Sequence, residues 1–187
     1  MEPFRSVRGG GARAWLAEPE ASLLRNLVGQ VMDLVGPQDD RPEAVPGDDP
    51  TMAALEAMLH DPGSEQTPQD PVLARLLPDG YRDDPEAAGE FRKYTEPALR
   101  SAKHQAAREM LDTLPAVGGR IQLTTEQGLA WLKALNDVRL ALGVRLGVTE
   151  DFEAQWGRLK TDDPQWTAFE VYAWLGAVQE SLVQALN

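Results

Sequence analysis

The chain of 187 residues contains no cysteine. This absence excludes disulfides, thiolate metal sites and thiol-based redox sensing by the chain itself. No apolar run reaches the roughly 18 residues that a membrane-spanning helix needs. The segment from Met1 to Arg13 also lacks the apolar centre of a signal peptide. We therefore expect a cytoplasmic protein without a membrane segment.

Basic residues are scarce relative to acidic ones. The chain has 18 Lys and Arg against 30 Asp and Glu, which gives a formal net charge of −12 and an isoelectric point near 4.6. Affinity for nucleic acid comes largely from cationic side chains that displace counterions from phosphates. Direct DNA binding without a partner protein is therefore not expected, unless a local basic patch outweighs the total charge.

Sequence motifs of common catalytic and metal sites are also missing. The two histidines, His60 and His104, lie far apart and show no metal-ligand spacing. There is no G-x-S-x-G, Walker-type loop or H-E-x-x-H motif. The adjacent acids Asp83 and Asp84 could form a catalytic pair, but capping of a helix start explains them better. We predict a protein that is not an enzyme and has no cofactor or metal; an enzyme built from carboxylates is the third alternative.

The N-terminal segment has the pattern of a β-hairpin. Phe4 to Arg8 and Ala12 to Ala17 flank three consecutive glycines, which tolerate the positive φ that tight hairpin turns require. Most of the remaining chain has apolar residues at helical spacing. The predicted fold is a single α+β, mainly α domain, with a short hairpin over residues 1–17, a flexible acidic loop over 36–50 and a helical body over 51–187.

Capping residues and glycines predict where the helices begin and end. The first helix starts at Pro19 and ends before Gly36. The stretch that follows, Gly36 to Pro50, carries four prolines and five acids against one arginine, so we expect a mobile loop or, alternatively, an acidic docking segment. Further helices are predicted over Met52–His60, Pro71–Leu77, Thr124–Leu146, Thr149–Leu159 and Gln165–Leu186, and a loop over Pro115–Arg120. The helix that ends at Leu146 should begin with a capping box formed by Thr124 and Gln127. Another helix should begin at Pro85 and either bend at Pro97 or break there, with Thr95 as a new cap.

Three arginines make the hairpin the one markedly basic element. Arg5, Arg8 and Arg13 occur with no acid between Phe4 and Ala17. One interpretation is a solvated hairpin face that balances the acidic remainder of the protein. The functional interpretation is an electrostatic contact with nucleic acid or with an acidic partner surface.

Charges of both signs alternate between Asp79 and Met110. Spacings such as Glu96 to Arg100 support a helix only weakly and indicate a largely solvated face. Arg92, Arg100 and Lys103 nevertheless fall along one stripe with Glu96. The alternatives are a plain charged surface and a stripe that a partner protein recognises.

A nearly all-apolar helix is predicted between Leu129 and Gly147, and it carries Asn136, Asp137 and Arg139. Polar groups in such a helix need partners. One interpretation is a buried polar network in which Arg139 pairs with a carboxylate such as Glu90, Glu96 or Glu180. The other is that Asn136 and Arg139 belong to a recognition groove for a partner. Glycines on the same stripe, Gly128 and Gly143, would let another helix approach closely.

Four tryptophans lie in the C-terminal half: Trp131, Trp156, Trp166 and Trp174. Aromatic residues at helical spacing usually belong to the core. If a subset were exposed, it would instead mark a protein interface or a homodimer.

Four blocks together resemble one known family: Phe4–Leu16 (FRSVRGGGARAWL), Leu77–Arg108, Leu129–Gly147 and Tyr172–Leu182 (YAWLGAVQESL). It is an actinobacterial domain-of-unknown-function family, commonly encoded beside the Clp protease adaptor ClpS, and some of its members are named oxidative-stress transcriptional regulators. The resemblance covers most of the chain and is weakest between Gly36 and Asp70.

The resemblance implies a regulator that acts by protein contact with RNA polymerase or a sigma factor. The alternative implied by the gene neighbourhood is an accessory or adaptor-like module of Clp-dependent proteolysis. If relatives sense oxidants through cysteines, this chain must rely on methionine oxidation or on another protein's sensor, or must not sense at all. The predicted partner contacts are Arg5, Arg8, Arg13, Arg92, Arg100, Lys103, Asn136 and Arg139.

Overall fold

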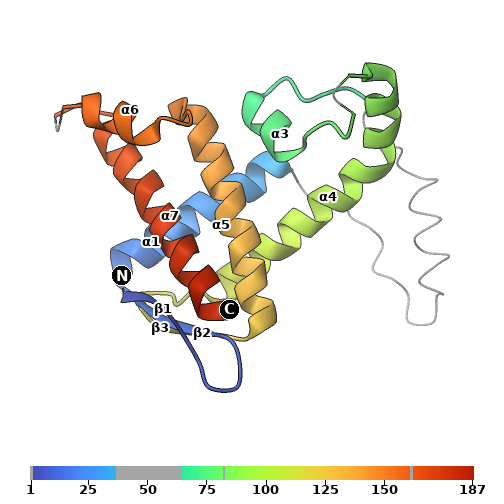
Figure 1. Ribbon diagram of the computed structural model, residues 1–187. Helices are drawn as coiled ribbons and strands as arrows, with labels where there is room; N and C mark the ends of the chain where they lie inside the picture. The colour runs from blue at the N-terminus through green and yellow to red at the C-terminus, as the bar shows by residue number, and fades with distance from the viewer. Residues whose placement is uncertain (1, 37–64, 82, 161) are drawn as a thin grey trace, which may run out of the picture.

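The computed structural model of the protein describes residues 2–36, 65–81, 83–160 and 162–187, and Figure 1 shows their arrangement. Helices dominate, and one small sheet lies at the lower end of the view. The α+β, mainly α prediction is confirmed. The elements in chain order are β1 (Glu2–Ser6), β2 (Ala12–Leu16), α1 (Glu18–Val35), α3 (Pro71–Leu76), α4 (Pro85–Thr113), β3 (Gly119–Leu123), α5 (Thr125–Leu146), α6 (Phe152–Arg158) and α7 (Trp166–Leu186).

The predicted hairpin exists, but it belongs to a sheet of three antiparallel strands in the order β1-β2-β3. Strand β3 pairs along the whole of β2, from Ala12 opposite Leu123 to Leu16 opposite Gly119. The predicted loop over Pro115–Arg120 is therefore wrong at its end, because Gly119 and Arg120 are in this strand. Burial alternates along β2 and over Arg120–Leu123 of β3, so Leu16, Ile121 and Leu123 enter the core.

One glycine of the hairpin turn is required for a steric reason. Gly11 has a φ of 90°, and a Cβ at this position would lie 2.1 Å from the carbonyl oxygen of Leu123. Only glycine therefore fits where the hairpin passes the end of β3. The turn itself is closed by hydrogen bonds between Val7 and its neighbours Gly10 and Gly11.

Most predicted helix starts and ends are confirmed. The Asp70 carboxylate accepts hydrogen bonds from the amides at the start of α3, and Asp84 does the same for α4. Thr124 and Gln127 form the predicted capping box of α5. One cap is wrong: Thr149 does not begin α6, which starts after Asp151. The predicted helix over 52–60 and the acidic loop after Gly36 lie outside the described residues.

Helix α4 is continuous through Pro97, so the alternative of a break capped by Thr95 is wrong. Figure 1 shows that the helix changes direction along its length, as the predicted bend requires. Proline has no amide hydrogen and its ring clashes with the preceding turn, which accounts for the bend.

Helix α5 runs through the centre of the molecule and packs against α4, α7, α3 and α1. The predicted role of its glycines is confirmed. A Cβ on Gly128 would lie 2.9 Å from Leu186, and one on Gly143 would lie 3.3 Å from Tyr172. Both neighbours belong to α7, so these two positions set how closely α5 and α7 approach.

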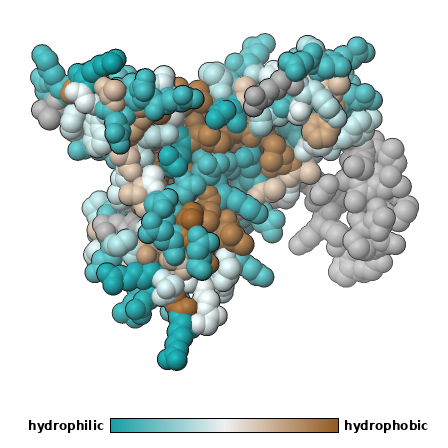
Figure 2. All heavy atoms as spheres, viewed as in Figure 1, coloured by the Kyte–Doolittle hydropathy of each residue, from teal (hydrophilic) through white to brown (hydrophobic). Residues whose placement is uncertain are grey.

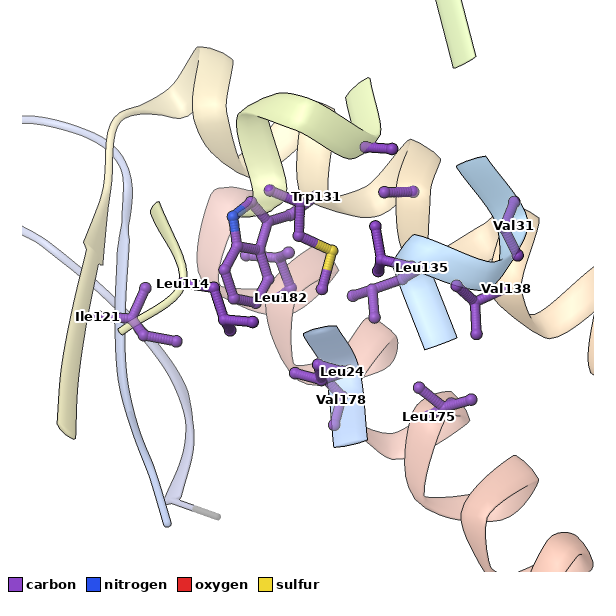
Figure 3. Packing of buried hydrophobic residues seen from close by; sticks show 14 of the residues in the cluster. Leu24, Val31, Leu114, Ile121, Trp131, Leu135, Val138, Leu175, Val178 and Leu182 are labelled. Carbon is purple, nitrogen blue, oxygen red and sulfur yellow. The ribbon is translucent and has the colours of Figure 1, made fainter. Parts of the chain in front are cut away.

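The core is one contiguous cluster, and Trp131 of α5 is its largest member. Its ring is fully buried and packs edge-on against Phe4 of β1, with 5.7 Å between the centroids. Its Nε1 donates a 2.7 Å hydrogen bond to Oγ of Thr113 at the end of α4. Figure 3 shows the indole among side chains from the sheet and the helices. Trp156, Trp166 and Trp174 are only partly buried.

Replacing Trp131 by alanine removes the side chain that joins the sheet, α4 and α5. We expect Trp131→Ala to lower the free energy of unfolding by about 3–5 kcal/mol, because a large cavity forms and the Thr113 bond is lost. Trp15→Ala is the matched control: its ring is 48% exposed, and we expect a change within about 0.5 kcal/mol. Urea denaturation of both variants measures these values, and equal losses would contradict the assignment.

Candidate functional site

The outer face of the sheet carries the exposed side chains Arg5, Arg13, Trp15, Arg120 and Gln122, here named the basic sheet face. The strand register sets them in two rows. Arg5 lies opposite Arg13, which lies opposite Gln122, and Trp15 lies between Glu2 and Arg120. Because side chains alternate along a strand, all five point away from the core.

The arginines of this face make no direct ion pair with a described residue, although one acid, Glu2, lies in the same row as Trp15 and Arg120. Arg5, Arg13 and Arg120 make no side-chain hydrogen bond or ion pair with described residues, and neither does Arg8, which is exposed on the hairpin turn. Like charges directly across two strands destabilise a sheet. The Arg5 and Arg13 pair therefore gains from any partner that brings negative charge. Figure 2 shows hydrophilic side chains projecting at the lower end, where the hairpin lies.

The predicted solvated stripe on α4 is wrong for its first half, because Arg92 and Glu96 are buried. Arg92 bonds to Glu96 at 2.7 Å, to the carboxylate of Asp79 and to the carbonyl of Leu77. Arg100 holds the other oxygen of Glu96 through Nε at 2.9 Å and Nη2 at 2.8 Å. This group of charges connects the bent part of α4 to the loop after α3.

The ion pairs of Arg92 determine the direction in which its pKa is shifted. Burial alone would lower the pKa of Arg92, but its hydrogen bonds to Glu96 and Asp79 outweigh burial and leave the pKa raised. The guanidinium therefore stays charged, and both of its Nη atoms are engaged, whereas its buried Nε has no hydrogen-bond partner among the described residues. Of the predicted contacts, Arg92 is buried, whereas Arg100 keeps 28% of its side chain exposed.

Lys103 of α4 reaches α5, where its Nζ donates a 2.7 Å hydrogen bond to the buried carboxylate of Asp137. A small pocket beside this pair has space for about one water molecule. His104 also lines the pocket, and its Nε2 lies in hydrogen-bond contact with the carbonyl oxygen of Gly36. The other lining side chains are mainly apolar and come from α1, α4 and α5.

The Asp137 carboxyl is unusual among the described groups. Burial raises its pKa, and the hydrogen bond and charge of Lys103 oppose the shift without cancelling it. A buried ion pair of this kind gains little net stability, because desolvation offsets the attraction. Lys103 and Asp137 therefore fix how α4 sits on α5 more than they strengthen the fold.

The predicted polar network on α5 does not form as one unit. Asn136 is exposed, so it is not part of a buried network. Arg139 pairs with no carboxylate among the described residues: it donates a 2.7 Å hydrogen bond to Oε1 of Gln179 and lies 5.3 Å from the ring centre of Tyr172. Both partners belong to α7. The prediction of an acidic partner for Arg139 is wrong: an amide and an aromatic face take its place, and the buried Nε has no hydrogen-bond partner among the described residues.

Three members of the basic sheet face are new relative to the sequence prediction: Trp15, Arg120 and Gln122. The sequence predicts a loop at Arg120, so it gives no indication that Arg120 lies beside Trp15. The alternation of polar and apolar residues in RIQL was the available signal, but four residues are too few to separate a strand from a loop.

No group of three or more His, Asp or Glu side chains in the described ranges is placed to hold a metal ion. Among the same residues, no helix is both long and apolar enough to cross a membrane. The described part of the chain is thus a mainly helical α+β protein with a basic surface on a small sheet.

The chain belongs to the family described as a domain of unknown function (DUF2017), whose model matches residues 1–186. It is 40% identical over 188 residues to proteins of Mycobacterium tuberculosis and Mycobacterium bovis named "Oxidative stress regulator AosR", covering 93% of this chain and 81% of those proteins. A Mycobacterium leprae relative is 36% identical over 195 residues, covering 97% of this chain and 85% of its own length. No solved structure matches the chain.

The raised pKa of Asp137 predicts a defined pH dependence of stability. Below the ordinary value of 3.8 the carboxyl is protonated in both the folded and the unfolded state. As the pH rises from there through the folded-state pKa, the unfolded state loses its proton first, so the contribution of Asp137 to stability decreases.

We expect the unfolding free energy of the wild type minus that of Asp137→Asn to fall as the pH rises from below 3.8 through the folded-state pKa of Asp137. Subtracting the stability of the variant cancels the contributions of the other titrating groups. Denaturation at each pH measures the difference. A difference that instead rises with pH would mean that Lys103 lowers the pKa of Asp137 more than burial raises it.

Proposed function

We propose that this protein is a non-enzymatic cytoplasmic regulator of the oxidative-stress response that acts on transcription by contact with RNA polymerase or a sigma factor. The observation that carries the proposal is the similarity over 93% of the chain to relatives named oxidative stress regulators. The similarity spans the sheet and the helices alike, so the relatives match the described body of the protein and not one isolated motif.

The charge distribution supports contact with a protein. The net charge of −12 opposes unaided binding to a nucleic acid backbone. The basic sheet face, together with Arg8, offers four arginines that form no ion pair with a described residue, against one acid, Glu2, on the same face. An acidic patch on a protein partner would meet these cations without the repulsion that an extended polyanion experiences from the rest of the molecule.

The absence of cysteine limits how such a regulator receives its signal. A thiol switch within this chain is excluded, so the oxidant signal must reach it through a partner protein or through methionine oxidation. Met110 is fully buried, and Met32 is partly buried, so neither is freely presented to an oxidant. The other three methionines, Met1, Met52 and Met58, lie outside the described residues, so both routes stay open.

The contact surface is tested by reversing its charge. The variant Arg5→Glu/Arg8→Glu/Arg13→Glu should no longer recover polymerase or sigma subunits from a lysate of the host, whereas the wild type should recover them. Mass spectrometry of an affinity pull-down provides the measurement. The reason is that three exposed cations on one hairpin become anions that repel an acidic partner surface.

The matched control is Arg75→Glu/Arg108→Glu/Arg158→Glu, which makes the same change in net charge at exposed positions on α3, α4 and α6. It should retain the partner. If both triple variants lose the subunits equally, the effect follows net charge and not the hairpin. Recovery of no transcription protein by the wild type would contradict the proposed function itself.

A further inference from the structure

The two edges of the sheet differ in a way that points to a binding mode. The β1 edge is protected: Pro3 removes a backbone donor, the register shifts between Glu2 and Arg5, and α7 packs alongside with Ser181 Oγ accepting from the amide of Phe4. Prolines, irregular register and covering helices are the usual means by which proteins block an exposed edge.

The β3 edge has none of these protections among the described residues. Its sequence, GRIQL, contains no proline, and its register with β2 is regular over all five residues. Its main contacts are with β2 and with α5, the helix that follows it in the chain. Within the described ranges, no backbone hydrogen bond outside the β2–β3 ladder involves residues 119–123. The outward-pointing amides and carbonyls of β3 are therefore available for another strand.

We propose that the β3 edge binds an extended acidic segment of a partner protein, which adds to the sheet as a fourth strand. This inference rests on the proposed function, because it names the chemistry of the partner that the regulator contacts. Strand addition draws its affinity from main-chain hydrogen bonds and its specificity from the side chains on alternate positions.

The register of the basic sheet face predicts which positions of the partner are acidic. A strand beside β3 places every second side chain on the outer face, next to Arg120 and Gln122. An acidic side chain of the partner beside Arg120 would lie in the cross-strand row that contains Arg120 and Trp15. An acidic side chain beside Gln122 would lie in the row that contains Gln122, Arg13 and Arg5. The 48% exposed ring of Trp15 adds an apolar contact next to these charges.

A peptide fits this site better than a single-stranded nucleic acid does. Nucleic acid platforms stack successive bases on several aromatic side chains, whereas Trp15 is the one aromatic residue on the outer face of the three strands. A nucleic acid also offers no row of amides and carbonyls to pair with the β3 backbone. The unpaired edge and the arginines together therefore select an acidic polypeptide.

The test is an NMR titration of the full-length ¹⁵N-labelled protein with a capped peptide of about ten residues in which valine alternates with aspartate. We expect peak shifts for the amides of residues 119–123 and for the indole of Trp15, with slower hydrogen exchange at the outward amides of β3. A peptide with lysine in place of aspartate should bind at least about tenfold more weakly, because it repels the arginines.

Two controls separate strand addition from simple charge attraction. N-methylation of the peptide on the edge that faces β3 should abolish the shifts, whereas methylation of the opposite edge should not. Arg120→Glu should weaken binding by about tenfold or more, while Arg158→Glu on α6, an exposed arginine without a described partner, should leave it unchanged.

The inference is wrong if the acidic peptide shifts no β3 amide, if both N-methylated peptides bind equally, or if a short oligothymidine shifts the same amides at lower concentration than the peptide. If the peptide does not bind but the pull-down still recovers transcription proteins, strand addition is rejected and the proposed function stands. If the peptide binds but the pull-down recovers no transcription protein, the proposed function is rejected and strand addition stands.

Discussion

The burial of α5 on several sides is the constraint on which the rest of the structure depends. This helix contacts α1, α3, α4 and α7, and its Trp131 also meets the sheet through Phe4. Gly128 and Gly143 let α7 come close enough to cover it. An apolar helix surrounded in this way cannot move without opening the core. The sheet, which packs on α7 through β1, is therefore held at a fixed place on the helical body.

This arrangement also decides which charges are available to a partner. Arg92, Glu96 and Asp137 are buried and engaged with one another or with Asp79, Arg100 and Lys103. Breaking such a group leaves an uncompensated buried charge, which costs about 3–5 kcal/mol. The arginines of the sheet carry no such cost, because they are exposed and form no ion pair with a described residue. The proposed contact with another protein therefore lies at the sheet and not along the inner side of α4.

Local sequence signals predicted the helical part of the fold, because each signal acts within one turn. Asp70, Asp84 and Thr124 cap the helices they were expected to cap, and the glycines of α5 face a neighbouring helix as their spacing indicated. The strand β3 was missed, because five residues have little periodicity and pairing with β2 joins segments about a hundred residues apart.

The same distinction applies to the candidate site. Arg5, Arg8 and Arg13 were found because a basic cluster is visible in the sequence itself. Charge periodicity could not show that Arg92 and Glu96 are buried, since an ion pair at four-residue spacing looks the same on a solvated face as under a bend. Only tertiary contacts show that the exposed positive charge of the hairpin extends to Arg120.

The proposed contact between this protein and its partner lies on the outer face of the sheet. The most direct measurement is in vivo photo-crosslinking with a benzoylphenylalanine residue placed either at Gln122 on β3 or at Gln105, an exposed position on α4. We expect a covalent adduct with a transcription protein from position 122 and none from position 105. An adduct from position 105 alone would contradict a contact at the sheet.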